Sequence, residues 1–99
     1  MRSIRVAHMD KTRPAVVLTR DVVLPHVTNV TIAPITSTIR GLSTEVAVGA
    51  QNGLDHSSVI SCDNITTVPA EALGRHIGLL LPGQEQALTD AICTAFDLE

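Results

Sequence analysis

Short apolar segments separated by polar turns run through the first 80 residues of the chain. Residues 3–9 alternate loosely between apolar and polar side chains, which is typical of a strand, and the polar residues 10–13 follow as a turn. The same reasoning predicts further strands over residues 15–19, 30–35, 44–48, 57–62 and 75–80. Proline, glycine and asparagine residues mark the turns between them. A series of this kind predicts an antiparallel sheet.

Two prolines modify this pattern. Pro34 lies inside the strand predicted at 30–35 and cannot donate a ladder hydrogen bond, so it indicates an edge strand or a bulge there. Residues 63–69 are mostly polar and are predicted as an irregular segment, after which Pro69 is expected to begin a short helical turn that continues to Leu73.

Beyond Pro82-Gly83 the apolar residues recur at helical spacing and predict a terminal amphipathic helix. Its apolar stripe consists of Ala87, Leu88, Ala91, Ile92, Ala95 and Phe96. Many short strands followed by one helix predict a mainly β (α+β) fold, a small and strongly bent antiparallel barrel whose open end the helix closes. No repeat or linker divides the sequence, so we expect a single domain over residues 1–99.

The composition narrows the class of protein. Hydrophobic residues make up 44% of the chain and Phe96 is the only aromatic one, so branched aliphatic side chains, which favour strands, must fill the core. No run approaches the roughly 20 apolar residues that span a bilayer, and the start has no apolar segment of the signal-peptide type. We therefore expect a cytoplasmic protein without a membrane segment.

The cysteines and histidines indicate neither a metal site nor a disulfide. Cys62 and Cys93 stand alone, and no histidine lies at ligand spacing from another. We accordingly expect no metal and no cofactor. His26, in the turn before the strand at 30–35, is the one histidine retained as a candidate proton carrier, with a surface or capping role as the alternative.

Charge is distributed unevenly although the net charge is only −3. Residues 1–40 hold six cations and two acids, whereas residues 41–99 hold one cation and eight acids. Such an asymmetry can give an acidic protein one basic face, which would suit a polyanion or an acidic partner. Interleaving of the two halves in the fold would remove that face, so both possibilities stay open.

Two residues carry the candidate chemistry. Proline disfavours the helical region for the residue before it, so Arg13 leaves the backbone from an extended position, with a guanidinium suited to phosphate. Thr36 begins the hydroxyl cluster Thr36-Ser37-Thr38 at the end of a strand. The alternatives are an ordinary ion pair of Arg13 with Asp10 or Asp21, and a hydroxyl that satisfies its own turn.

Taken in order, four segments resemble the MazF/PemK toxins, most closely the short mycobacterial-type members. These segments are residues 12–19, 30–46, 53–68 and 73–78. The resemblance spans about residues 12–95, and several motifs in register are more specific than any one of them. It implies an SH3-like barrel with a C-terminal helix, the MazF/CcdB-like fold, that forms a homodimer and is held inactive by a cognate MazE-like antitoxin.

The resemblance also implies a reaction and its residues. It implies a metal-independent, sequence-selective endoribonuclease acting on single-stranded mRNA or rRNA, in which the ribose 2′-hydroxyl attacks the adjacent phosphate. The family's catalytic arginine falls on Arg13 and its catalytic threonine or serine on Thr36. The expected RNA-binding residues are Lys11, Thr12, Ser37, Asn64, Thr66 and Thr67.

The chain departs from the family pattern in two ways. The connection before Arg13-Pro14 is only residues 10–12, where family members carry a long loop, and the usual N-terminal tryptophan is missing. Without Trp or Tyr, base recognition must rely on hydrogen bonds and arginine planes. Two alternatives remain from the sequence: a CcdB-type toxin that poisons gyrase without enzymatic activity, and a plain binding module on a small barrel.

Overall fold

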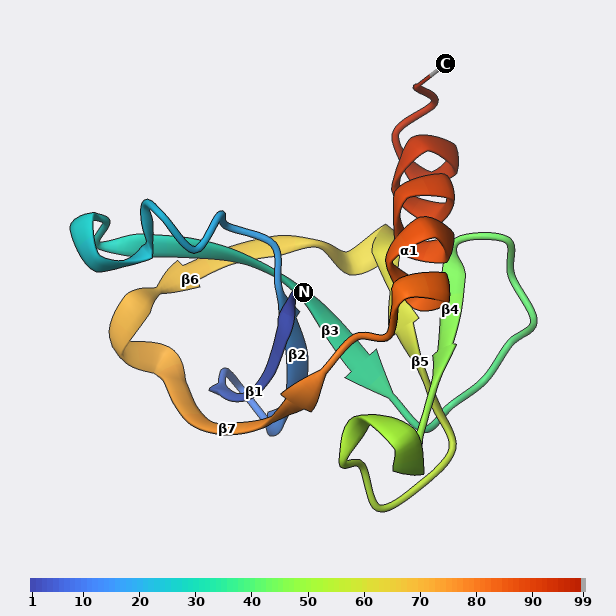
Figure 1. Cartoon of the computed structure of the whole chain (residues 1–99), viewed down its shortest axis with the longest axis horizontal. Coiled ribbons are helices and arrows are strands. Elements are labelled where there is room, and N and C mark those ends of the chain that lie inside the picture. Colours follow the sequence, from blue (N-terminus) through green and yellow to red (C-terminus); the bar gives the residue numbers. More distant parts are fainter. Residues whose placement is uncertain (99) are drawn as a thin grey trace.

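The computed structural model describes residues 1–98, which form a curled antiparallel sheet and one long helix (Figure 1). The strands are β1 (Ser3–His8), β2 (Thr12–Val17), β3 (Asn29–Thr36), β4 (Glu45–Val48), β5 (Ser58–Ser61), β6 (Thr66–Pro69) and β7 (Leu73–Leu79). The helix is α1 (Pro82–Ala95), and the single 3-10 turns are η1 (Leu24–His26), η2 (Ala50–Asn52), η3 (Cys62–Asn64) and η4 (Ala70–Ala72). The strand order is β4-β5-β3-β2-β1-β7, with β6 also pairing with β3. The sheet closes into a half-barrel, which confirms the predicted fold class.

β6 is a strand that the sequence pattern did not predict. It pairs with the first half of β3, with Asn29 opposite Pro69 and Ile32 opposite Thr66. Thr66 and Thr67 are exposed and only Val68 is buried, so the segment has little of the apolar alternation that marks a strand. Its pairing partner, and not its own side chains, makes it extended. The helical turn expected after Pro69 is present as η4.

The prediction that Pro34 marks an edge strand or a bulge was wrong about the edge. β3 pairs with β2 along one side and, on the other side, with β6 through its first half and with β5 through its last two residues. The Thr31 N–H donates to Thr19 Oγ1 and the Thr31 carbonyl accepts from Leu18, both on the β2 side. Because backbone groups alternate along a strand, Pro34 turns its donor-less nitrogen to the other side. There it falls between the β6 and β5 ladders, where no donor is needed.

The central strands bury residues on both faces of the sheet. In β2 the neighbours Ala15 and Val16 are fully buried, yet they belong to different apolar clusters, since successive side chains of a strand point to opposite faces. One cluster lies under α1 and includes Val16, Ile35 and Leu88. The other lies under β6 and the turn that follows it. This arrangement explains the continuous apolar runs of β2 and β3.

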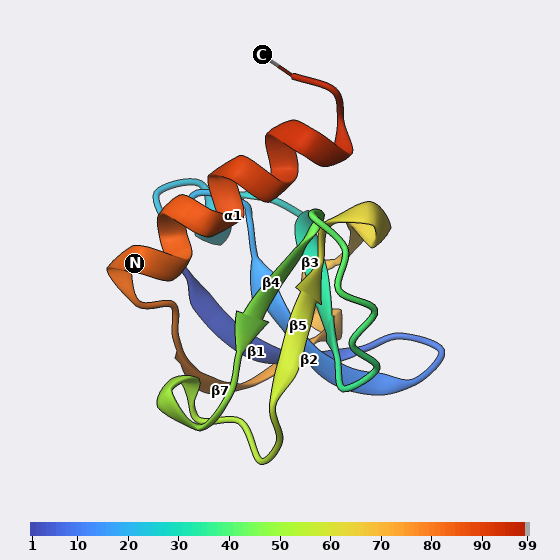
Figure 2. The ribbon, with the colours of Figure 1, turned by 90° about the vertical axis from the view of Figure 1, so that its right-hand side faces the viewer.

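α1 covers one end of the curled sheet and packs on β4 and η3 (Figure 2). Its predicted stripe is correct at the centre, where Leu88 and Ala91 are buried, and wrong at both ends, where Ala87 and Phe96 are exposed. Ala87 lies within the helix next to the buried Leu88 and faces solvent, whereas Phe96 is the C-cap that follows the last helical residue. Within residues 1–98, none of the helices has the length and the apolar character that crossing a membrane requires.

Candidate active site

Arg13 lies inside β2, one residue after the strand begins. It pairs with Ala7 of β1, and its neighbour Pro14 pairs with Val6. His8 and Thr12 are the last partners of the two strands, so residues 9–11 alone make the turn between them. The short connection predicted from the sequence is therefore confirmed, and the β1–β2 ladder fixes the backbone from which the guanidinium extends.

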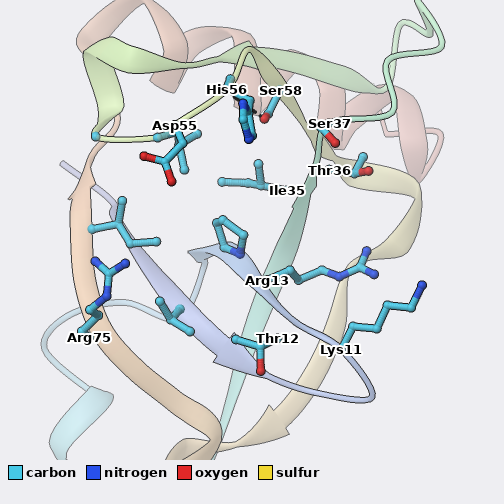
Figure 3. A pocket seen from close by; sticks show the side chains of 15 residues that line it. Lys11, Thr12, Arg13, Ile35, Thr36, Ser37, Asp55, His56, Ser58 and Arg75 are labelled. Carbon is cyan, nitrogen blue, oxygen red and sulfur yellow. Dashed lines mark hydrogen bonds between the residues drawn. The ribbon is translucent and has the colours of Figure 1, made fainter.

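The Arg13 guanidinium is free to bind an external anion. The alternative predicted from the sequence, an ion pair with Asp10 or Asp21, is not formed. Among residues 1–98 the one ion pair joins Arg2 to Glu85, with 3.7 Å between Nε and Oε1. Figure 3 shows the Arg13 side chain extending into open space beside Lys11.

Thr36 is the last residue of β3 and is partly buried. Its Oγ1 accepts a hydrogen bond of 3.1 Å from the Thr38 N–H. The alternative predicted for this hydroxyl, that it satisfies its own turn, is therefore confirmed. That bond occupies an acceptor position of the hydroxyl and leaves its hydrogen available for donation. Thr36 is thus held by its own turn and can still donate to a ligand.

Arg13 and Thr36 form part of the wall between two cavities. The first cavity has a volume of about 450 Å³ and the second about 420 Å³, and both residues line both of them. Pro14 and Ile35 extend the wall in the first cavity, and Pro34 extends it in the second. A phosphate bound by this pair would therefore have room for a nucleotide on either side.

The other predicted RNA-binding residues divide between the cavities and the surface. Lys11, Thr12 and Ser37 line the first cavity. Asn64 lines the second, where its Nδ2 donates to Ser61 Oγ at 2.7 Å. Thr66 and Thr67 of β6 line neither of the two. The structure brings four of the six to the Arg13–Thr36 wall and leaves the threonines of β6 apart from it.

Several residues of the first cavity carry chemistry that the sequence did not reveal. Asp55, His56 and Arg75 line it, on the side away from Arg13 (Figure 3). The available signal was the Asn52-Gly53 turn, which only Leu54 separates from Asp55-His56. His26, the histidine retained from the sequence, lies in η1, is exposed and lines neither the first nor the second cavity.

The two cavities collect much of the chain's positive charge. Four of its seven cations line them, namely Lys11, Arg13, Arg40 and Arg75. Three acids, Asp55, Glu45 and Asp63, lie among these cations. The excess of cations is confined to the first cavity, where Lys11, Arg13 and Arg75 stand against Asp55. In the second cavity Arg13 and Arg40 are balanced by two acids.

The thiols stand apart from this chemistry. Burial in the core, with the charge of the adjacent Asp63 adding to it, raises the pKa of Cys62 from 9.0 to about 11. Cys93 is half-buried, and both thiols are free. No group of three or more His, Cys, Asp or Glu side chains among residues 1–98 is placed to hold a metal ion.

Comparison with known proteins gives a consistent result. Residues 4–96 match the family model of the PemK-like, MazF-like toxin of type II toxin-antitoxin systems. The chain is 61% identical over 99 residues to the endoribonuclease MazF3 of Mycobacterium tuberculosis, covering 100% of this chain and 96% of that protein. The structure of the Mycobacterium tuberculosis toxin MazF-mt6 superposes with a TM-score of 0.96 at 60% identity and 99% coverage of both chains.

A more distant structure shares the fold as well. An endoribonuclease from a mycobacterial species, solved in complex with its cognate antitoxin, superposes with a TM-score of 0.84 at 26% identity. The superposition covers 99% of this chain and 93% of that one. The matches thus extend over β2 and β3, the strands that carry Arg13 and Thr36.

Proposed function

Because the chain belongs to the family of PemK-like, MazF-like toxins of type II toxin-antitoxin systems, we propose that it is an endoribonuclease that cleaves single-stranded RNA. Cleavage of mRNA or rRNA would inhibit translation and growth. The observation that carries the proposal is the wall between the two cavities, to which Arg13, without an ion pair among residues 1–98, and the Thr36 hydroxyl both contribute. Family membership favours this activity over the gyrase-poisoning alternative.

The reaction requires no nucleophile from the protein. The ribose 2′-oxygen forms a bond to phosphorus while the bond from phosphorus to the 5′-oxygen breaks. The 2′-hydroxyl loses its proton and the leaving 5′-oxygen gains one, which gives a 2′,3′-cyclic phosphate and a 5′-hydroxyl end. The protein has to align the two oxygens and to stabilise the charge that builds on the phosphorane.

Arg13 supplies that stabilisation in our proposal. An arginine side chain stays charged in proteins and offers a planar fork of donors that matches phosphate oxygens. The β1–β2 ladder holds its backbone, so little reorganisation is needed when charge develops. Thr36 adds a hydroxyl donor from the neighbouring strand, β3.

We also propose the partners that the family implies. The mycobacterial relative solved with its cognate antitoxin supports binding of a MazE-like antitoxin by this chain. The acidic, partly disordered tail of that antitoxin would occupy the two cavities in place of RNA, with the cations of the first cavity as its main contacts. The active form would be a two-fold homodimer, which sedimentation of the purified protein would test.

The test is cleavage of end-labelled, mixed-sequence RNA in excess EDTA. We expect discrete fragments with 5′-hydroxyl ends, because the proposed step uses no metal ion. Arg13→Ala and Thr36→Ala should each abolish the fragments while circular dichroism and sedimentation stay unchanged. Arg20→Ala is the matched control, since Arg20 is exposed and lines neither of the two cavities.

Three outcomes would contradict parts of the proposal. Cleavage that EDTA abolishes would rule out the metal-independent mechanism. Undiminished cleavage by Arg13→Ala would remove the assigned role of Arg13. Absence of cleavage of any RNA by the wild-type protein would reject the ribonuclease activity itself.

A further inference from the structure

The first cavity is large enough to hold a nucleobase. Its volume of about 450 Å³ lies within the range of roughly 300–1,000 Å³ usual for small-molecule sites. Apolar side chains, including Ile35 and Leu54, form its floor, and both of these are buried. Polar side chains stand around the floor on two sides (Figure 3). Arg13, Thr36 and Ser37 make one side. The other side consists of Asp55, His56, Ser58 and Arg75.

The loop on the second side is fixed to the rest of the fold. Asn52, only 1% exposed, donates from Nδ2 to the Leu79 carbonyl (2.9 Å) and to Gln84 Oε1 (2.7 Å). Its Oδ1 accepts from Gln84 Nε2 at 3.0 Å, so the two amides bind each other reciprocally. Gly53 adopts a positive φ of 83°, and a Cβ there would lie 2.6 Å from the Ile77 carbonyl oxygen. β7 and α1 thus hold the start of the loop in place.

The side chains that this loop presents have no partner of their own. Asp55 and His56 are exposed, and Asp55 forms no ion pair with any residue of 1–98. The buried Ser58 hydroxyl donates to the His56 carbonyl at 3.0 Å, which fixes the backbone behind the imidazole. Figure 3 shows the His56 ring directed toward Ile35, and the Asp55 carboxylate to the left of Ile35, on the side of the cavity where Arg75 lies. A rigid loop therefore offers an acceptor and a ring face to a ligand.

We propose that Asp55 and His56 form a base-reading wall, which binds a nucleobase next to the cleaved phosphate and selects bases with an exocyclic amino group over uracil. An ionised carboxylate only accepts hydrogen bonds, so it can pair with the amino group of cytosine, adenine or guanine. Uracil places a carbonyl oxygen at the position of the cytosine amino group and would face the carboxylate without a donor. The location next to the cleaved phosphate rests on the proposed ribonuclease function, whereas the base preference does not.

His56 supplies the stacking surface. Splayed RNA bases stack on aromatic rings or on histidine. This chain has no Trp and no Tyr, and its one Phe, Phe96, is exposed at the end of α1. His56 is the histidine that lines the first cavity, where it can cover one face of a base whose edge meets Asp55.

The direct test is binding of cytidine 3′-monophosphate and uridine 3′-monophosphate, followed by NMR. We expect the cytidine nucleotide to shift the amide signals of residues 53–58 and to bind roughly ten- to hundred-fold more tightly than the uridine nucleotide. Asp55→Asn, whose amide both donates and accepts, should bring this ratio close to one. Asp21→Asn removes the same charge from an exposed carboxylate outside the first cavity and should keep the ratio.

Variants of His56 test the stacking role separately. His56→Ala should weaken binding of both nucleotides by about the same factor, because a ring face does not distinguish their edges. His56→Phe should restore binding while the preference for cytidine persists. If Phe fails to restore binding, stacking by His56 is wrong.

Mapping of cut sites in mixed-sequence RNA separates this inference from the proposed function. Cleavage depleted of uracil at one position beside the cut, with the depletion lost in Asp55→Asn, supports both. Cleavage with the same base profile in wild type and Asp55→Asn overturns the inference and leaves the ribonuclease intact. Selective cytidine binding without any RNA cleavage supports the base-reading wall and rejects the enzyme. An equal affinity of the wild type for both nucleotides overturns the wall.

Discussion

One oxygen atom of Thr36 serves structure and chemistry together. Its lone pairs accept the Thr38 N–H, which closes the turn after β3, and its hydrogen stays available for the substrate phosphate. Both roles require the hydroxyl, and neither requires the side-chain methyl group.

The RNA cleavage of Thr36 variants should therefore depend on whether the new side chain has a hydroxyl. Thr36→Ser keeps both hydrogen bonds and should retain most RNA cleavage. Thr36→Val keeps the shape, loses the donor and should abolish cleavage. Loss of the bond to the Thr38 N–H should also lower the free energy of unfolding by about 1 kcal/mol, measured by urea denaturation. Equal activity of the valine and serine variants would exclude a role for the hydroxyl.

Cys62 should affect stability only at high pH. Its pKa in the folded protein is about 11, above the ordinary 9.0, so below pH 9 both states carry the proton and the effect is constant. Between pH 9 and 11 the unfolded chain loses the proton first, and the free energy of unfolding should fall. Urea denaturation over this range should show the fall in wild type and Cys93→Ala, and a smaller fall in Cys62→Ala.

At the residue scale the sequence predicted Arg13 and Thr36, and it did not predict the residues on the other side of the first cavity. Arg13 and Thr36 could be found because each lies next to a recognisable feature, Pro14 in one case and a strand end in the other. Asp55 and His56 follow an ordinary turn signal, and nothing local shows that the turn faces Arg13. Only the folding of β5 onto β3 brings that loop to the cavity.

Among the elements, β7 and η2 are packed so closely that Gly78 has no room for a side chain. A Cβ on Gly78 would lie 2.1 Å from the Asn52 backbone oxygen, closer than any two such atoms can stay. This contact requires glycine on β7 and connects that strand to the loop that carries Asp55.

Gly78→Ala should accordingly destabilise the protein and disturb the base-reading wall. Overpacking of this kind costs about 1–3 kcal/mol of unfolding free energy, which urea denaturation measures. The preference for cytidine over uridine 3′-monophosphate should fall as well, because η2 must shift. Gly83→Ala in the first turn of α1 meets no atom within 4 Å and should be neutral or stabilising by up to about 1 kcal/mol. A Gly78→Ala variant as stable as wild type would contradict the close approach.

The elements that the sequence predicted are those whose own side chains specify them. The apolar residues of β1 and the stripe of α1 carry that information. Ile4 and Ala7 of β1 are buried in the two different clusters, and Leu88 and Ala91 of α1 are buried in the first of them. β6 has a single buried side chain, Val68, and its extended form depends on β3, more than thirty residues away. A pattern read along the chain has no access to such a pairing. The position of Pro34 between two ladders escaped prediction for the same reason.

At the scale of the whole molecule, four of the seven cations of this net negative chain line the two cavities. These cations are Lys11, Arg13, Arg40 and Arg75. They would neutralise several phosphates of an RNA strand that crosses both cavities. Binding should then depend on the local charge and not on the net charge of −3.

RNA affinity should consequently fall steeply with salt. With three to four phosphates neutralised, the logarithm of the binding constant should fall by about 2 to 3 per tenfold rise in salt, the slope for single strands being about 0.7 per contact. The measurement uses an oligonucleotide with a 2′-deoxy sugar at the cut site. Lys11→Ala should reduce the slope by about 0.7 and leave the base preference as it was. An unchanged slope would mean that Lys11 contacts no phosphate.

The divided pairing of β3 also has a kinetic consequence. β6 is bonded to β3 alone, whereas the end of β3 that carries Thr36 is held by β5, which β4 supports in turn. β6 can therefore detach as a separate opening unit while Thr36 keeps its place. Hydrogen exchange at the amides of residues 66–68 should be faster than at residues 59–60, and addition of RNA should slow the first set only if Thr66 and Thr67 bind it. The catalytic end of β3 would then stay ordered during motions that remodel its other half.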